Sequence, residues 1–357
     1  MSILVVDGVV KNYAWGQVDG LVPWCPPTGE PQAELWFGAH PGGPSPITDG
    51  SQRTLADIEG LGDLPLVKLL AAAKPLSIQV HPDADRAASG FQAQASGGPQ
   101  LFADPHEKSE IVIALTPFQT HAGWRDPAEA ADLFHRAGAS AELVSLIAQS
   151  PRPVAVEAVL AVEPQIQQEL SGQIVAAAID AHWPPAAVSA LATIVSTYPN
   201  DAGALVVPLL RHHTLEPGEA LAVPAGVVHS YIDGLAIEVM TSSDNVLRLG
   251  LTAKPIAIPE AVAAIRTDRG PVVLPAAQAY RPEGMPFTVE MIDAPEESRD
   301  VRLAHGVARV VLCLEGEAQV QACVASPGQA VIVSADEPEM TAVIRGRAVR
   351  VTSKGSR

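Results

Sequence analysis

The stretches PGEALAVPAG, at residues 217–226, and PGQAVIVSAD, at residues 327–336, resemble each other and decide the fold. Each has a Pro-Gly turn, an apolar strand and a second turn. A repeated turn and strand is typical of a duplicated β architecture. The alternative is that any Pro-Gly turn before an apolar strand has this appearance, and one sequence leaves both interpretations open.

The two copies differ in one chemical respect. The first copy reaches His229, whereas the equivalent position of the second copy is Glu339 and no histidine is nearby. In jelly-roll domains of the cupin type, this turn and strand open a metal-bearing hairpin. We therefore expect two cupin-like jelly-roll β-domains, of which only the first keeps a metal ligand here.

The texture of the sequence changes twice along the chain. In the first stretch, which is rich in Pro and Gly and poor in helical signals, strands are predicted at 65–70, 76–80 and 111–115. From Asp126-Pro127, an N-cap followed by a proline at the first helical position, the chain is Ala-rich and helical to about Tyr198. Short strands then return, so the expected fold is mainly β with an α insertion.

These changes divide the chain into four expected parts. Residues 1–124 and 204–260 would form the two halves of a catalytic cupin-like β-domain, with residues 125–203 as a helical inserted domain. Residues 261–357 would form a C-terminal jelly-roll domain without metal ligands. The position of the insertion, between Glu110 and His229, motivates the hypothesis that it is a lid over the cleft.

Composition and charge exclude several classes of partner. The formal net charge is −17, so binding to nucleic acid or to an anionic membrane would be repulsive. No apolar run is long and uncharged enough to span a bilayer, and no basic leader is present, so we expect a cytoplasmic protein. Cys25, Cys313 and Cys323 match no metal motif and are expected to be free thiols. The expected oligomeric state is a monomer.

The first candidate ligands lie in LSIQVHPD, residues 76–83. Alternate residues of a strand face the same side, so Ser77, Gln79 and His81 would point together while the residues between them pack into the core. Pro82 removes a backbone donor and ends the strand, which leaves His81 near a rim. The alternative is a half-exposed strand whose polar face meets water.

Two further segments add candidate ligands. In DPHEKSE, residues 104–110, Lys108 and Glu110 share one face by the same period of two. A turn delivers His229 at the start of a strand, where a lone histidine is more often structural. Two histidines, one carboxylate and one amide oxygen nevertheless form a ligand set suited to Zn²⁺ or a similar divalent ion.

Arg248 lies between two leucines and should point opposite to them. One interpretation is a buried ion pair with Glu238, and the other is that the arginine faces an anionic substrate; both can hold together.

These residues resemble one family, the type I mannose-6-phosphate isomerases. The resemblance is carried by separated stretches: YAWG (13–16), AELWFGAHP (33–41), LPLVKLL (64–70), LSIQVHPD (76–83), DPHEKSE (104–110), PAGVVHSY (224–231) and SDNVLRLGLTAK (243–254). Their order and spacing make the set specific. The helical stretch and the C-terminal stretch carry no comparable motif and follow only by architecture.

The resemblance implies a set of functional residues. It places the zinc ligands at Gln79, His81, Glu110 and His229, and the catalytic arginine at Arg248. Positions that line the family's substrate pocket fall on Lys68, Ser77, Lys108, Glu238 and Lys254. Two positions depart from the family: Glu107 stands where a histidine is common, which puts any role of that histidine in doubt, and Ala14 replaces an aspartate.

The implied activity is the interconversion of mannose 6-phosphate and fructose 6-phosphate through an enediol, with one Zn²⁺ per chain and a hexose phosphate as the partner. Arg248, a permanent cation, would stabilise the oxyanion. The proton shuttle would be Glu238 or Lys108, and the residues leave this choice open. Ser77, with Lys254 or Lys68, would bind the phosphate.

Two other functions remain open from the residues alone. The first is a cupin-type metal oxygenase with iron at His81, Glu110 and His229. The second is a non-catalytic sugar-binding β-protein. Oxygen activation needs no cluster of cations at the metal, so Lys108, Arg248 and Lys254 are the residues that discriminate between these classes.

Overall fold

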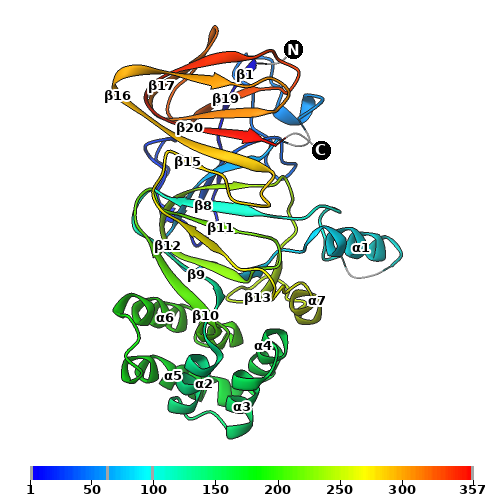
Figure 1. Cartoon of the computed structure of the whole chain (residues 1–357), viewed down its shortest axis with the longest axis vertical. Coiled ribbons are helices and arrows are strands. Elements are labelled where there is room, and N and C mark those ends of the chain that lie inside the picture. The colour runs from blue at the N-terminus through cyan, green and yellow to red at the C-terminus, as the bar shows by residue number, and fades with distance from the viewer. Residues whose placement is uncertain (1–2, 62–63, 98–99, 355–357) are drawn as a thin grey trace.

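The computed structural model describes residues 3–61, 64–97 and 100–354, and it has the predicted class of fold, mainly β with a helical insertion. The molecule is elongated, with a β-sheet region at each of two levels and a group of helices at the far end (Figure 1). Both described chain ends lie at the level opposite the helices (Figure 1). The metal-site candidates lie between these extremes, in the middle level.

The middle level is a highly curved antiparallel sheet of eleven strands among the described residues. Its main path runs β14-β11-β8-β12-β6-β5-β2, and β7, β9, β10 and β13 pair beside it. The bounds are β2 (Val9–Lys11), β5 (Glu34–Phe37), β6 (Leu66–Ala72), β7 (Ile78–Val80), β8 (Glu110–Ala114), β9 (Phe118–Trp124), β10 (Leu210–Leu215), β11 (Ala220–Val223), β12 (His229–Met240), β13 (Leu247–Gly250) and β14 (Val272–Leu274). The three predicted early strands are confirmed as β6, β7 and β8.

Strand β12 connects the two sides of this sheet. Its first residues pair with β7 and β9, and its later residues pair with β6 and β8. The ligand-bearing strands before the insertion therefore flank a strand that follows it, so the site forms only when both stretches pack together.

The second sheet has seven strands in the described part of the chain, in the order β1-β19-β17-β20-β16-β15, with β18 beside β17. The bounds are β1 (Ile3–Asp7), β15 (Ala279–Tyr280), β16 (Phe287–Leu303), β17 (Arg309–Val320), β18 (Cys323–Ala325), β19 (Gln329–Val333) and β20 (Met340–Ser353). A small pair, β3 (Gln17–Val18) and β4 (Pro31–Gln32), stands apart. A continuous apolar core fills the space between the two large sheets.

The repeat seen in the sequence is present in both sheets. Gly218 and Gly328 have φ angles of 88° and 83°, a left-handed conformation that favours glycine, and the strands β11 and β19 follow them. Strand pairing, however, crosses the expected domain limits: β1 pairs with β19, and β14 pairs with β11. The division into four parts therefore stays a prediction.

Helices α2 to α6 form the predicted insertion, the helical block. They are α2 (Pro127–Arg136), α3 (Ala141–Gln149), α4 (Arg152–Leu160), α5 (Pro164–Asp180) and α6 (Pro185–Thr197). The predicted start is confirmed: the Asp126 carboxylate accepts from the backbone N–H groups of Ala128 and Glu129, with Pro127 in the first turn. The 3₁₀ turns η2 (Ala202–Leu205) and η3 (Val207–Leu209) lead from the block to β10.

The helical block shares one buried core with the metal-bearing strands. Ile78 and Val80 of β7 belong to the same apolar cluster as Phe134 of α2 and Ile194 of α6. One face of β7 is therefore covered by helices, which leaves its other face for Ser77 and Gln79, as the predicted alternation requires.

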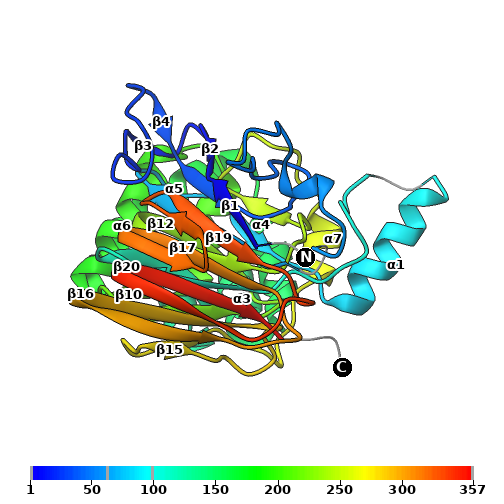
Figure 2. The same cartoon turned by 90° about the horizontal axis from the view of Figure 1, so that it is seen from above.

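Helix α1 (Ala84–Ala95) was not predicted, because the first stretch carries few helical signals. It extends to the side of the sheets (Figure 2). Asp83 caps it by accepting from the N–H of Arg86, and Gln94 binds the backbone of Leu101 and Phe102. Contacts outside the helix thus compensate for a sequence without an apolar stripe.

The remaining helical elements are short. They are η1 (Leu55–Asp57) and α7 (Ile258–Ala263). None of the helices in the described ranges combines the length and the apolar character that crossing a membrane requires.

Candidate metal centre

Three candidate residues occupy one row across three neighbouring strands. Gln79 of β7 is paired with His229 of β12 on one side and with Arg248 of β13 on the other. Directly opposed residues of antiparallel strands point to the same face, so these three side chains share one surface of the sheet. A second row brings together Trp36, Lys68 and Glu238, from β5, β6 and β12.

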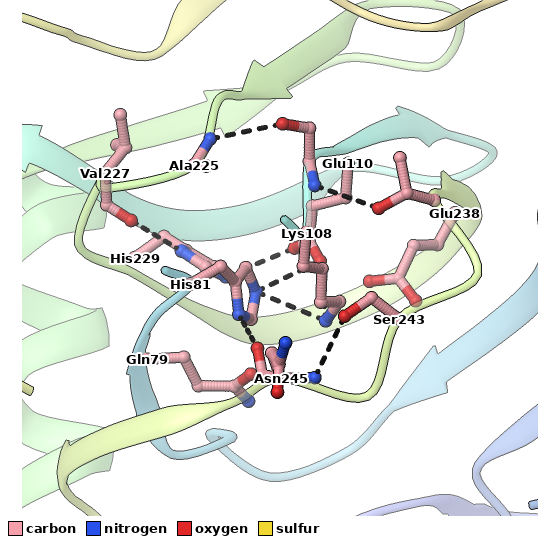
Figure 3. A network of polar contacts seen from close by, with 12 residues as sticks. Gln79, His81, Lys108, Glu110, Ala225, Val227, His229, Glu238, Ser243 and Asn245 are labelled. Atoms are coloured by element: carbon pink, nitrogen blue, oxygen red, sulfur yellow. Dashed lines mark hydrogen bonds and ion pairs between the residues drawn. The ribbon is translucent and has the colours of Figure 1, made fainter. Parts of the chain in front are cut away.

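His81, Glu110 and His229 converge on one buried point. Their ligand atoms all lie within 4.8 Å of one another. The Nε2 of His81 lies 3.2 Å from Oε2 of Glu110, and the Nε2 of His229 lies 3.1 Å from Oε1 (Figure 3). Two imidazoles and a carboxylate at this spacing are suited to a divalent transition metal.

The ring orientation of both histidines is fixed by the backbone. Nδ1 of His81 lies 2.9 Å from the carbonyl of Asn245, and Nδ1 of His229 lies 3.0 Å from the carbonyl of Val227 (Figure 3). A carbonyl accepts only, so each Nδ1 donates to the backbone and each Nε2 is the ring nitrogen that faces Glu110. Burial, with a smaller contribution from Lys108, lowers the pKa of His81 to about 3, which favours the neutral ligand form.

Glu110 is held as a carboxylate in this buried position. Burial alone would raise its pKa, but Lys108 and the two histidines hold the pKa of Glu110 well below its usual range. Lys108 Nζ lies 3.0 Å from Oε2, and Tyr231 donates a hydrogen bond of 2.6 Å to Oε1. Oε2 is buried and, although Lys108 lies beside it, makes no well-formed hydrogen bond within the described residues, so this oxygen is available to a metal ion.

The amide group of Gln79 has one fixed contact. Its Nε2 donates to Oγ of Ser77 at 3.1 Å, which turns the amide oxygen away from Ser77. The neighbouring His229 and Arg248 lie on the same face. The geometry brings together His81, Glu110 and His229, and Gln79 lines the same cavity as Glu110 and His229, so its amide oxygen stays a predicted fourth ligand.

Lys68 and Glu238 form a buried ion pair of 2.6 Å, and Glu34 lies 3.8 Å from the same ammonium. Burial raises the pKa of Glu238, against the opposing effect of Lys68. The interpretation that Glu238 pairs with Arg248 is therefore wrong, because the β5–β6–β12 row places Lys68 beside it. Arg248 instead lines the cavity, and its Nη1 donates to the Val246 carbonyl at 3.4 Å.

The site opens into a cavity of about 750 Å³. Its cations fall into two groups. Lys68 and Lys108 are paired with carboxylates, whereas Lys74, Arg248 and Lys254 have no ion pair with any carboxylate in the described ranges. The second group, together with Ser77, is therefore free to meet an anionic substrate.

Sequence reasoning missed Asn245, which supports the site from behind. Its amide donates to the carbonyls of Asp104 and His106, at 2.8 and 2.7 Å, and accepts from the N–H of Ala103 at 2.8 Å. The Asp104–Glu110 segment is thereby tied to the backbone that orients His81. Tyr231 and Lys74 were also missed, although Tyr231 lies within a motif that carries the family resemblance.

The comparisons with known proteins agree with this geometry. The family model described as phosphomannose isomerase type I, catalytic domain, matches residues 3–127. The mannose-6-phosphate isomerase of Salmonella typhimurium is 32% identical, over 97% of this chain and 98% of that protein. This chain belongs to the type I mannose-6-phosphate isomerase family. The human mannose-6-phosphate isomerase is 31% identical over 70% of each chain.

Solved structures extend the isomerase relationship to the whole chain. The crystal structure of the Salmonella typhimurium mannose 6-phosphate isomerase bound to fructose 6-phosphate and zinc has a TM-score of 0.83 and 29% identity, and it covers 99% of this chain and 100% of that one. A zinc-bound holo structure of mannose 6-phosphate isomerase has a TM-score of 0.82 at the same identity and coverage. The helical block and the second sheet therefore belong to the isomerase fold as well.

Proposed function

We propose that this chain is a zinc-dependent aldose–ketose isomerase that interconverts mannose 6-phosphate and fructose 6-phosphate by proton transfer through an enediol. One observation carries the proposal: a buried His81–Glu110–His229 ligand set lies beside Lys108 and opens into a cavity with unpaired cations. The zinc and fructose 6-phosphate of the Salmonella typhimurium structure support the same metal and substrate class.

Gln79, His81, Glu110 and His229 would hold one Zn²⁺. The ion supplies Lewis-acid stabilisation of negative charge on substrate oxygens. The lowered pKa values of His81 and Glu110 favour a neutral imidazole and an ionised carboxylate, the forms in which these two residues bind a metal ion.

Lys108 is the better candidate for moving the proton between C1 and C2. Its Nζ lies 3.2 Å from Nε2 of His81 and 3.0 Å from Glu110, directly beside the metal position. Glu238 is engaged at 2.6 Å by Lys68, which reduces its availability as a base. We assign the Lys68–Glu238 pair to the sugar hydroxyls and Arg248 to stabilisation of the developing oxyanion.

Phosphate binding falls to Ser77 and Lys254, with Lys74 as a further cation. Lys68 is the weaker candidate here because Glu238 and Glu34 already satisfy its charge. The Ser77 hydroxyl accepts from Gln79 and keeps its own proton for a phosphate oxygen.

The oxygenase and the sugar-binding alternatives find no specific support. Both accommodate His81, Glu110 and His229, but neither uses an ammonium 3.0 Å from the carboxylate ligand or the unpaired cations of the cavity. We further propose a cytoplasmic monomer with the four-part domain division given above; the three unpaired cysteines support a reducing compartment.

A coupled assay of mannose 6-phosphate conversion tests the function most directly. The purified protein should turn over this substrate, lose turnover with a chelator and regain it with Zn²⁺. Absence of turnover with both phosphosugars, in protein shown to hold zinc, would rule out the isomerase.

A further inference from the structure

The junction that follows helix α6 reaches the cavity from the helical block. Thr197 and Tyr198 line the same cavity as Ser77 and Lys254, although they come from the insertion. The residues after Tyr198 then turn into η2 and lead back to the sheet. The junction therefore lies beside the part of the cavity formed by the segments of Ser77 and Lys254.

Tyr198 is hydrogen-bonded to residues 75–77, which form the first wall of this part of the cavity. Its phenol donates a hydrogen bond of 2.8 Å to the carbonyl of Pro75, two residues before Ser77. Burial raises the pKa of Tyr198, so the hydroxyl keeps its proton and remains a donor. On the other side of the same wall, the N–H of Leu76 donates to the carbonyl of Tyr231 at 2.8 Å. The backbone that leads into Ser77 is thus held from both sides.

Asp201 is hydrogen-bonded to residues 252–254, which form the second wall. One carboxylate oxygen accepts from the N–H of Thr252 at 3.1 Å, two residues before Lys254, and the other accepts from the N–H of Gly203 at 2.8 Å. Gly203 packs against Gly250 so closely that a Cβ on Gly203 would lie 2.6 Å from the Cα of Gly250. The junction and the Lys254 segment therefore have little freedom to move apart.

The shared core argues that this arrangement is a fixed frame. Ile78, on the strand that follows the first wall, and Leu249, on the strand that precedes the second, are buried in the cluster that also contains Leu191 and Ile194 of α6. A lid that swings open would expose this apolar surface to water, which is unfavourable.

We propose that Tyr198 and Asp201 are positioning residues that set the distance between Ser77 and Lys254, so that the helical block frames the phosphate-binding end of the cavity. The inference rests on the proposed function, since it assigns the phosphate to that end. Neither residue needs to touch the reacting carbons, so both should act on substrate binding and leave the proton transfer intact.

The test uses the full-length, zinc-loaded protein with Tyr198→Phe and Asp201→Ala. Each variant removes one hydrogen bond to a wall, so KM for mannose 6-phosphate and the inhibition constant for inorganic phosphate should both rise about five- to tenfold. The value of kcat and the zinc content should stay within about twofold of the wild type. Gln168→Ala is the matched control, because its bond to Asn200 holds the outer, exposed side of the same junction.

The outcomes separate the inference from the function. If KM and phosphate inhibition are unchanged in both variants, the frame is wrong and the proposed isomerase function is unaffected. If a variant loses both kcat and its bound zinc, the frame is also wrong, because the residue then supports the metal site. A wild type without turnover that still gains thermal stability from inorganic phosphate would remove the isomerase and retain the anion site.

Hydrogen exchange of the wild type gives an answer that needs no variant. Inorganic phosphate should slow exchange together in peptides that cover 74–78, 197–204 and 250–254. Slowing in the two walls without any change at 197–204 would contradict the frame, whether or not the variants fold.

Discussion

The two sheets use the same turn and strand for opposite purposes. In the middle sheet, the turn after β11 delivers His229 into a buried cluster with His81 and Glu110. In the second sheet, Glu339 stands in the equivalent position and forms an exposed ion pair of 2.5 Å with Arg302. The scaffold is therefore shared, whereas the chemistry depends on which partners the neighbouring strands place opposite the hairpin.

The interiors of the sheets differ in the same way. The second sheet is filled by apolar residues such as Val311, Val331 and Ile344. Its buried Arg309 donates to the carbonyls of Ala304 and Ser334, while its Nε has no partner among the described residues. The middle sheet buries ionisable groups that face one another around the cavity. Catalytic capacity thus follows from several buried ionisable side chains that gather around one cavity, an arrangement found here in the middle sheet.

The largest effect should come from removing a ligand. His229→Ala is expected to lose bound zinc and to lower turnover at least about a thousandfold, since Lewis-acid stabilisation contributes several kcal/mol. Metal analysis and the coupled assay measure both quantities. If the variant keeps zinc at full occupancy and turns over normally, His229 has a structural role, the alternative that the sequence left open for a lone histidine.

Arg248→Ala should separate the metal from the chemistry. Loss of a preorganised cation in a cavity is expected to lower kcat about a hundred- to a thousandfold while zinc remains bound, because no described contact links Arg248 to the carboxylate ligand. Kinetics and metal content, measured on the same sample, are decisive. A variant that loses its zinc would make Arg248 a structural residue.

Tyr231→Phe should weaken zinc binding about ten- to a hundredfold. The phenol donates 2.6 Å to Glu110, and such partners orient a ligand without touching the metal. Competition with a chelator measures the affinity. Phe118 packs edge-on against the Tyr231 ring, so the ring itself should keep its place in the variant. An unchanged zinc affinity would show that this hydrogen bond does not support metal binding.

Acid should act on the middle sheet through His212, which lies opposite His121 on β10 and β9. Burial, with His213 and Arg125, lowers the pKa of His212 to about 4. The unfolded chain therefore binds more protons below pH about 6.5, and stability falls as pH drops from there toward 4. In metal-free protein, the titration of His212 should lower the free energy of unfolding by about 2 kcal/mol between pH 7 and pH 5.

Urea unfolding at the two pH values measures this effect. His212→Gln should lose that share of the acid sensitivity, whereas His135→Gln, on an exposed turn of α2, should keep it. Equal acid sensitivity in the wild type and in both variants would assign the pH dependence to other groups.

The smallest effect belongs to the second sheet. Glu339→Gln should leave zinc content and turnover unchanged and alter the free energy of unfolding by no more than about 0.5 kcal/mol, because its ion pair with Arg302 is exposed. Isomerase kinetics and thermal unfolding check this. A loss of activity would mean that the second hairpin also contributes to catalysis.

Local patterns in the sequence predict the elements that depend on near neighbours. The alternation of residues 77–81, the cap at Asp126 and the Pro-Gly turn at Gly218 each follow from chemistry within a few positions. The partner of Glu238 cannot be predicted in this way. Lys68 meets it because β6 pairs with β12, and the helical block separates these two strands in the sequence. Periodicity shows which face a residue occupies, but not which strand lies beside it.

The residues that position the metal ligands could not be predicted from the sequence for the same reason. Asn245 acts through its backbone carbonyl on His81 and through its amide on residues 103–106, so its role appears only when three segments meet. Helix α1 depends on Gln94 binding a later loop. Both are tertiary contacts that no short window of the sequence contains.

The pairing of β1 with β19 also bears on how the chain assembles during translation. Ile3 pairs with Val333, far along the chain, so during synthesis β1 cannot pair with β19 until residues 329–333 have been made. A product that stops before residue 329 would present β1 as an unpaired strand edge, a template for aggregation. This single contact makes the fold sensitive to premature termination far from the catalytic residues.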